Sequence, residues 1–228
     1  TKFQLCVQGP DGHGASLWNK FNRVYYICNT TASELRVGAF NGTIDEITPT
    51  IIHSDTANVE NRYAGIVMGT DGYAYAYFEK KNVSGNYVLK TARSSSVCSD
   101  ASLTGCITGS WDALVDHGTV DAVRDSGSIV SLANGKMLIV WRADDDIKYQ
   151  YCTTCTSTSS DWSTETNLVT NGATTTQNIG LVSDESNYAW LAYSNGTAII
   201  ASRFDSSTNT WSATTTIAAS GSNPSITV

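Results

Sequence analysis

The sequence has few charged residues and no long hydrophobic run. Charged side chains make up 15% of the 228 residues, and the abundance of Thr, Ser, Gly and Tyr favours strands and turns over helices. No window approaches eighteen consecutive apolar residues, which excludes a transmembrane helix. Lys and Arg together number fourteen against twenty-one Asp and Glu, giving a net charge of −7. The sequence therefore argues against a nucleic-acid partner, because phosphate binding needs a basic surface.

A repeat in the C-terminal half of the chain predicts the fold. Four short alternating or apolar runs are separated by turn formers, which predicts a four-stranded antiparallel meander. The runs are Ile179–Ser183, Tyr188–Tyr193, Ala198–Phe204 and Thr214–Ala218. The pattern recurs about fifty residues earlier, and Trp111, Trp162 and Trp211 each enter the fourth run of successive copies. Four strands in roughly 40 to 50 residues are typical of a β-propeller blade.

We therefore predict an all-β fold, a single β-propeller segment of four-stranded antiparallel blades that is incomplete in this chain. Two insertions are expected in the second blade, at Lys80–Asn86 and Ser94–Gly109. The end segments are predicted to be lone strands, the fourth strand of a preceding blade and the first strand of a following one. The predicted segments are 3–9 (fourth strand), 15–55, 61–118, 126–172 and 177–221 (blades), and 223–228 (first strand).

This strand count leaves three alternatives for the whole protein. The chain, which starts at Thr1 without an initiator Met, is expected to be a mature or trimmed product. It is either a part of a longer propeller, or a compact four-bladed ring with irregular closure, or a subunit whose end strands pair with neighbouring chains. The third alternative predicts self-association into a head-to-tail filament, because an unpaired strand edge is a template for another strand.

The loop Asp205–Trp211 (DSSTNTW) and its counterpart Ser157–Trp162 carry a family resemblance. They are similar to a degenerate Asp-box, the Ser-x-Asp-x-Gly-x-x-Trp hairpin of sialidase-like propellers. Neither copy has the Gly of that hairpin or its complete order. The resemblance implies a propeller architecture over most of the chain, and it is shared with many secreted propellers that only bind.

A sialidase-like enzyme would need three arginines, a Tyr-Glu nucleophile pair and an Asp acid/base. Arg62 and Arg124 supply two arginines, and Tyr77 with Glu79 or Glu60 would supply the pair. The Arg-Ile-Pro run expected of that family is absent, since none of the three prolines follows an Arg-Ile pair. The resemblance therefore assigns no catalytic residue.

Propeller topology selects the candidate ligand-binding residues. Loops from strand four to the next strand one, and from strand two to strand three, lie on the side where ligands usually bind. The first kind of loop contains Arg62, Arg124, Asp125, Gln177 and His13. Such side chains would hold a sugar hydroxyl or a carboxylate of a glycan or protein ligand. The alternative is that loop ends are polar in any β-protein.

A glycoside hydrolase is the second hypothesis for this side. It would need two carboxylates roughly 5 to 10 Å apart. Glu60 and Asp125 are a pair of this kind.

The six cysteines predict disulfides and a secreted protein. The predicted pairs are Cys98 with Cys106, Cys152 with Cys155, and Cys6 with Cys28. There are two alternatives to the two local disulfides. Cys98, Cys106, Cys152 and Cys155 could together bind zinc, and Cys152 with Cys155 has the spacing of a redox motif. No cofactor and no metal site is expected, because the Asp144–Asp146 run suits a solvated hairpin turn and lacks the pattern of an EF-hand.

Four N-glycosylation sequons begin at Asn29, Asn41, Asn82 and Asn195. Three of them fall in predicted strand-two-to-three turns. Taken together, the sequence favours an extracellular or cell-surface binding or structural module over an enzyme, with a glycan or protein ligand at the propeller mouth. The alternative is a secreted sialidase-like or other glycoside hydrolase that acts through Arg and carboxylate residues.

Overall fold

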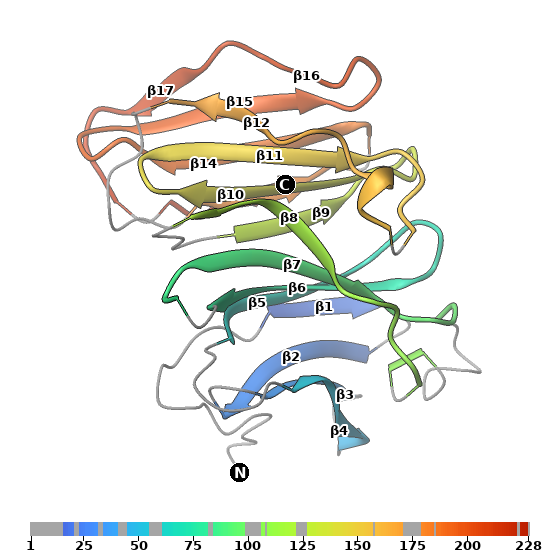
Figure 1. Cartoon of the computed structure of the whole chain (residues 1–228). Coiled ribbons are helices and arrows are strands. Elements are labelled where there is room, and N and C mark those ends of the chain that lie inside the picture. Colours follow the sequence, from blue (N-terminus) through green and yellow to red (C-terminus); the bar gives the residue numbers. More distant parts are fainter. Residues whose placement is uncertain are drawn as a thin grey trace. The chain divides into compact units, whose positions relative to one another are not determined.

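A computed structural model of the chain has an all-β architecture of four antiparallel sheets (Figure 1). In the described residues no helix is long and apolar enough to cross a membrane. The residues that the structure describes are 16–20, 23–31, 34–40, 45–54, 61–81, 84–98, 106–107, 109–121, 127–156, 158–170, 179–184, 186–222 and 224–227.

The first two sheets follow the order of the chain, each strand lying beside the next. The first sheet contains β1 (Ser16–Lys20), β2 (Arg23–Thr31), β3 (Glu34–Phe40) and β4 (Asp45–Ser54). The second contains β5 (Asn61–Met68), β6 (Ala74–Lys81), β7 (Tyr87–Arg93) and β8 (Val115–Asp121). Each sheet is thus a four-stranded meander, the form of a propeller blade.

The third and fourth sheets repeat this order. The third contains β9 (Gly127–Ser131), β10 (Met137–Ala143), β11 (Asp146–Cys152) and β12 (Thr166–Val169). The fourth contains β13 (Gly180–Ser183), β14 (Tyr188–Ser194), β15 (Ile199–Asp205), β16 (Thr210–Trp211) and β17 (Thr215–Ala218). Both β16 and β17 pair with β15, so the fourth position of this blade is shared by two short strands.

The local sequence explains the strands and their turns. Every residue of β10 (MLIVWRA) is buried, as expected of a strand covered on both faces. The hairpins that lead into β6 and β10 contain Gly72 and Gly135, with φ of 85° and 87°. Glycine adopts this left-handed conformation without the strain that a side chain would cause, so both tight turns form in register.

Contacts divide the chain into two compact units, residues 1–116 and 117–228, and each has its own core. In the first unit, Tyr25 and Ile27 of β2 pack in one cluster with Ala76 and Phe78 of β6. In the second unit, Leu138 and Val140 of β10 pack with Leu191 of β14 and Phe204 of β15. In each unit the core therefore joins two successive blades.

The all-β propeller class is confirmed, with one strand more than four blades of four predict, because β16 and β17 share the last position of the fourth sheet. One prediction was wrong: β6 continues to Lys81, into the segment predicted as an insertion. Its last three residues pair with the first three of β7, from Glu79 opposite Leu89 to Lys81 opposite Tyr87. The ladder is longer than the hydrophobic run because polar residues also pair there.

The ends of the chain differ from the prediction where they are described. Residues 224–227 belong to no strand, and the segment passes β13 at Gly180, where an added Cβ would lie 3.1 Å from Cγ2 of Ile226. A strand needs a laddered partner, which the described residues do not supply here. The predicted strand 3–9 lies outside the described residues.

Two disulfides are present as predicted, Cys98–Cys106 and Cys152–Cys155, with Cα separations of 5.0 and 5.2 Å. They replace the zinc and redox alternatives. The third pair involves Cys6, which is not described, and stays a prediction. Asp144 and Asp145 form the β10–β11 turn, as predicted for this acidic run.

Candidate functional site in the second strands

The second strand of each blade carries a polar residue at one fixed position, opposite an aliphatic residue of the third strand. Each aliphatic partner is buried and lies at or near the beginning of its strand. The pairs are Asn29 with Leu35, Glu79 with Leu89, Arg142 with Ile147, and Ser194 with Ile199. All four lie at the end of the blade where strand two turns into strand three. We call this the strand-two polar position.

Three of these side chains are almost completely buried. Glu79, Arg142 and Ser194 are 0%, 1% and 2% exposed, respectively. Burying a charged group costs several kcal/mol unless other groups compensate for the lost water, so such residues seldom persist for packing alone. The buried carboxylate of Glu79 therefore marks this end of the second blade as the candidate site, and the buried guanidinium of Arg142 marks the same end of the third blade.

Glu79 has a defined surrounding in the second blade. Its backbone pairs with Arg62 of β5 on one side and with Leu89 of β7 on the other. Tyr77, two residues earlier on the same face, places its ring across Gly65, where an added Cβ would lie 2.1 Å from Cε1 of the ring. A glycine at this position lets the aromatic ring cover the adjacent strand beside Glu79.

Ser194 anchors the corresponding turn of the fourth blade. Its hydroxyl donates a hydrogen bond to the carbonyl oxygen of Gly221 (3.1 Å) and accepts one from the backbone N–H of Gly196 (3.1 Å). These bonds tie the turn after β14 to the segment after β17. In the fourth blade, the side chain at the strand-two polar position is therefore hydrogen-bonded to backbone groups.

Arg62 is the one predicted ligand-binding residue whose backbone is described, and it lies directly opposite Glu79. The other four lie outside the described residues. In the sequence, Arg124 and Asp125 immediately precede β9, and Gln177 precedes β13. Sequence reasoning did not select Arg142 or Ser194 individually, because only the strand pairing shows that they are equivalent to Glu79.

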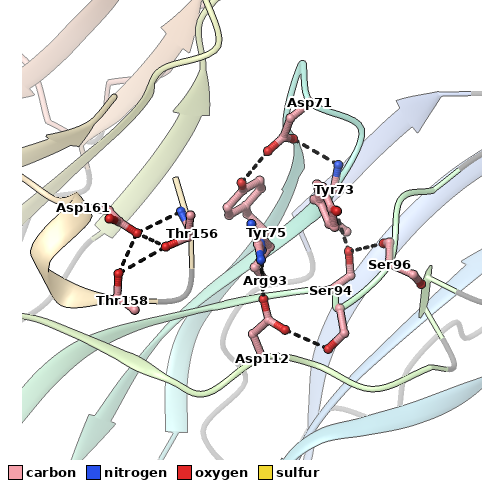
Figure 2. A network of polar contacts seen from close by, with 12 residues as sticks. Asp71, Tyr73, Tyr75, Arg93, Ser94, Ser96, Asp112, Thr156, Thr158 and Asp161 are labelled. Carbon is pink, nitrogen blue, oxygen red and sulfur yellow. Dashed lines mark hydrogen bonds and ion pairs between the residues drawn. The ribbon is translucent and has the colours of Figure 1, made fainter. Parts of the chain in front are cut away.

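The opposite end of the second blade holds a polar network that serves the scaffold (Figure 2). In the β5–β6 turn, Asp71 accepts hydrogen bonds from the N–H of Tyr73 (3.1 Å) and the hydroxyl of Tyr75 (2.7 Å). Arg93 of β7 forms an ion pair with Asp112 (2.8 Å) and stacks on the ring of Tyr73 at 4.6 Å. The carboxylates of Asp71 and Asp112 both bind groups of their own blade. Among the described residues, this network therefore serves the scaffold.

The electrostatics of this network are those of a stable structural contact. Burial, and then the hydrogen bond with Asp71, raise the pKa of Tyr75 well above its ordinary value. Burial lowers the pKa of Arg93, but its bonds with Asp112 outweigh that effect and the pKa is raised. Tyr75 therefore stays neutral and Arg93 charged at any physiological pH.

The fourth blade repeats this scaffold with other residues. Asp184 accepts hydrogen bonds from the N–H of Ser186 (2.9 Å) and from Nε1 of Trp190 (3.4 Å). Arg203 of β15 stacks on Tyr188 at 4.2 Å and on Trp190 at 5.6 Å. An Asp in the first turn, aromatic residues on strand two and an Arg on strand three thus recur two blades apart.

The two loops that resemble an Asp-box also have structural roles. In the first, Asp161 accepts hydrogen bonds from the N–H of Thr156 (3.2 Å) and the hydroxyl of Thr158 (2.7 Å), as Figure 2 shows. In the second, the buried hydroxyl of Ser206 accepts a hydrogen bond from Nδ2 of Asn134 (2.8 Å) and donates one to the carbonyl oxygen of Asn187 (2.8 Å). This second loop therefore connects the third blade with the fourth.

A further buried polar cluster lies beside the third blade. His117 of β8 contacts Oε1 of Gln150 through Nδ1 (3.1 Å), and Nε2 of Gln150 donates to the carbonyl oxygen of Ser163 (2.6 Å). Oε1 of Gln150 thus accepts a hydrogen bond from the Nδ1–H of His117. The sequence offered no ligand spacing for this histidine, and its buried position agrees with a structural role.

No family model and no curated protein matches the sequence. The structure, however, is similar to solved glycoside hydrolases of family GH43, which supports the β-propeller class. The similar structures include a GH43 endo-arabinanase from Bacillus licheniformis (17% identity, 87% of this chain, 73% of that chain, TM-score 0.54). They also include an α-L-arabinofuranosidase from Clostridium thermocellum (13%, 89%, 72%, TM-score 0.53) and a β-xylosidase/α-arabinofuranosidase from a compost microbial metagenome (12%, 85%, 73%, TM-score 0.53).

At these identities the likeness concerns the fold. It bears out the propeller part of the Asp-box resemblance, whereas the sialidase label stays a prediction. The chain shares its architecture with carbohydrate-active enzymes over most of its length.

Proposed function

We propose that this chain is an extracellular carbohydrate-active β-propeller, a glycoside hydrolase, whose site lies at the strand-two-to-three end of the blades. The observation that carries the proposal is the fully buried carboxylate of Glu79 at the strand-two polar position. The fold shared with GH43 hydrolases supports it. The two disulfides are the support for an extracellular location.

Glycoside hydrolysis requires one carboxyl group that protonates the leaving oxygen and a second that activates water or attacks the sugar. Glu79 is proposed as one of the two. Glu60, which precedes β5 in the sequence, is the candidate for the other. Arg62, which lies opposite Glu79 on β5, is proposed to orient the substrate, because a guanidinium donates paired hydrogen bonds to sugar or carboxylate oxygens.

The experiment is a rate measurement on aryl arabinofuranosides, xylosides, hexosides and sialosides, and on arabinan and xylan. Glu79→Gln keeps the shape of the side chain and removes the ionisable group. Loss of a general acid or base lowers the rate by about 10²- to 10⁴-fold. Asp112→Asn is the matched control, because Asp112 is a carboxylate occupied in an ion pair with Arg93 (2.8 Å) at the opposite end of the second blade. Equal rates in wild type and Glu79→Gln would show that Glu79 is not catalytic.

A binding module is the second candidate function. Arg142 favours it, since a guanidinium supplies hydrogen-bond donors and no acid/base chemistry at neutral pH. A glycan array decides between the two: binding that is lost in Arg142→Met, together with no turnover of any substrate, supports the module. Self-association through the end segments stays a proposal of the same kind, and light scattering with and without residues 222–228 tests it.

A further inference from the structure

The turn between β14 and β15 presents Asn195 in an unusual hydrogen-bonded state. Its side-chain oxygen Oδ1 accepts three hydrogen bonds, from the N–H of Thr197 (3.1 Å), the hydroxyl of Thr197 (3.0 Å) and the N–H of Ala198 (2.8 Å). The backbone N–H of Asn195 donates to the carbonyl oxygen of Ala198 (3.1 Å). The side chain is therefore held by its oxygen alone, and its amide nitrogen Nδ2 has no hydrogen-bond partner among the described residues.

The turn is rigid and open to solvent. Gly196 has φ of 92°, which glycine tolerates, and its N–H is fixed by the buried hydroxyl of Ser194. Gly196 and Thr197 are exposed, and Asn195 is half-buried. An incoming reagent can thus approach the turn without unfolding the strands on either side.

An amide nitrogen is a weak nucleophile, because its lone pair is delocalised into the carbonyl group. Hydrogen bonds to the amide oxygen favour the form in which negative charge collects there and make an N–H proton easier to remove. Asn195 has three such donors, and one of them is the hydroxyl of Thr197. The residues Asn195, Gly196 and Thr197 also form the Asn-x-Thr acceptor sequence of N-glycosylation.

We propose that Asn195 is an N-glycan acceptor in the folded protein, with the Thr197 hydroxyl as the group that completes the acceptor. The donor class is an oligosaccharide linked to a polyprenyl diphosphate. A bond forms between Nδ2 and C1 of the first sugar, the bond between C1 and the diphosphate oxygen breaks, the polyprenyl diphosphate leaves, and one Nδ2 proton passes to a base.

The other sequons of the chain provide internal comparisons. Asn29 lies within β2 and pairs with Leu35, so it is held in a ladder and not in a turn. Asn41 and Asn82 lie outside the described residues. Asn223 is followed by Pro224 and Ser225, a combination that the acceptor sequence excludes. The chain therefore provides an accessible acceptor at Asn195, an acceptor sequence within a strand at Asn29, and a control asparagine at Asn223 whose sequence is excluded by proline.

The test uses the folded protein, produced in a host without N-glycosylation and then incubated with an oligosaccharyltransferase and lipid-linked oligosaccharide. Peptide mass spectrometry after enzymatic release of the glycan in ¹⁸O-water reports the occupancy of each Asn. We expect modification of Asn195 and none of Asn29 or Asn223. Thr197→Ser keeps the hydroxyl and should keep the modification, whereas Thr197→Val, similar in shape, should abolish it.

Two results would overturn the proposal: an unmodified Asn195 in folded wild-type protein under conditions that modify a control acceptor peptide, or equal occupancy in Thr197→Val and wild type. Circular dichroism of each variant shows that it is folded. The outcome does not depend on whether the chain hydrolyses or only binds a glycan.

Discussion

The hydroxyl of Ser206 offers a direct test of how the third and fourth blades are held together. It is fully buried and lies in the turn after β15. It makes two hydrogen bonds of 2.8 Å, one from Asn134 of the third blade and one to the carbonyl oxygen of Asn187 in its own blade. We expect Ser206→Ala to lower the free energy of unfolding, because it leaves two polar groups without that partner.

The size of the effect follows from these contacts. A hydrogen bond contributes about 1 kcal/mol net, and a buried group left unsatisfied costs about 1–3 kcal/mol. Asn134 is exposed, so water can replace the hydroxyl at its Nδ2, which also has a long contact (3.5 Å) with the backbone oxygen of Ser206. The carbonyl oxygen of Asn187 still accepts a hydrogen bond from the backbone N–H of Ser206 (2.9 Å). Lys136 still binds the backbone oxygen of Ser206 at 2.7 Å, so the turn keeps one link to the third blade. Because neither partner is left buried and unsatisfied, we expect the loss of two hydrogen bonds to cost about 1–2 kcal/mol, still a measurable share of the roughly 5–15 kcal/mol that a domain has.

The assay is urea unfolding followed by tryptophan fluorescence. Ser207→Ala is the matched control, since Ser207 is the exposed neighbour and its hydroxyl bonds only to Asp205 (2.6 Å). We expect less than about 0.5 kcal/mol for this control. A double-mutant cycle with Asn134→Ala isolates the contact between blades. If Ser206→Ala and Ser207→Ala have equal effects, or the cycle gives no coupling, the proposed connection does not contribute to stability.

Three further predictions concern the scaffold. The pKa of Tyr75 is raised in the folded state, so the contribution of this residue to stability is complete below about pH 10, the ordinary tyrosine value, and decreases as the pH rises above it. Above about pH 10, the urea midpoint should therefore fall more steeply with pH in wild type than in Tyr75→Phe. Parallel curves for the two proteins would contradict this. Replacing Cys98 and Cys106 by Ser opens an eight-residue loop and should cost roughly 2.5 kcal/mol on chain-entropy grounds, with an unchanged thermal midpoint as the contrary result. Phe204→Ala removes a buried ring whose centroid lies 5.3 Å from that of Trp211, and it should lower the free energy of unfolding by about 3–5 kcal/mol. A loss near that of a surface substitution would show that Phe204 is not part of the core.

Much of the fold was predictable because blades are built from local pairings. The predicted strands Tyr188–Tyr193 and Ala198–Phe204 match β14 and β15 to within one residue at each end. Alternating side chains between turn formers determine such strands without knowledge of distant contacts. The two local disulfides were predictable for the same reason, since eight and three residues separate the partners.

Contacts between blades were not predictable in this way. The loop Asp205–Trp211 identified a turn, but nothing in it indicates Asn134, seventy-two residues earlier, as the partner of Ser206. The insertion expected at Lys80–Asn86 likewise placed Glu79 at the margin of the second strand of blade two. The structure shows instead that Glu79 is buried and lies inside β6, where it pairs with Leu89 of β7. This pairing with the next strand cannot be read from the sequence around Glu79.

The two ends of the blades differ in what they keep constant. At the first-turn end, the second and fourth blades use the same elements, an Asp in the turn and an Arg stacked on an aromatic ring. At the strand-two polar position, the geometry is constant and the chemistry varies, with Asn29, Glu79, Arg142 and Ser194 in successive blades. A scaffold needs the same contact in each repeat, whereas a ligand site needs different functional groups delivered by equivalent backbone positions. In the second blade, the side chain at this register is the buried carboxylate of Glu79, whereas in the fourth blade Ser194 hydrogen-bonds to the backbone at the equivalent position, which makes Glu79 the first side chain to substitute.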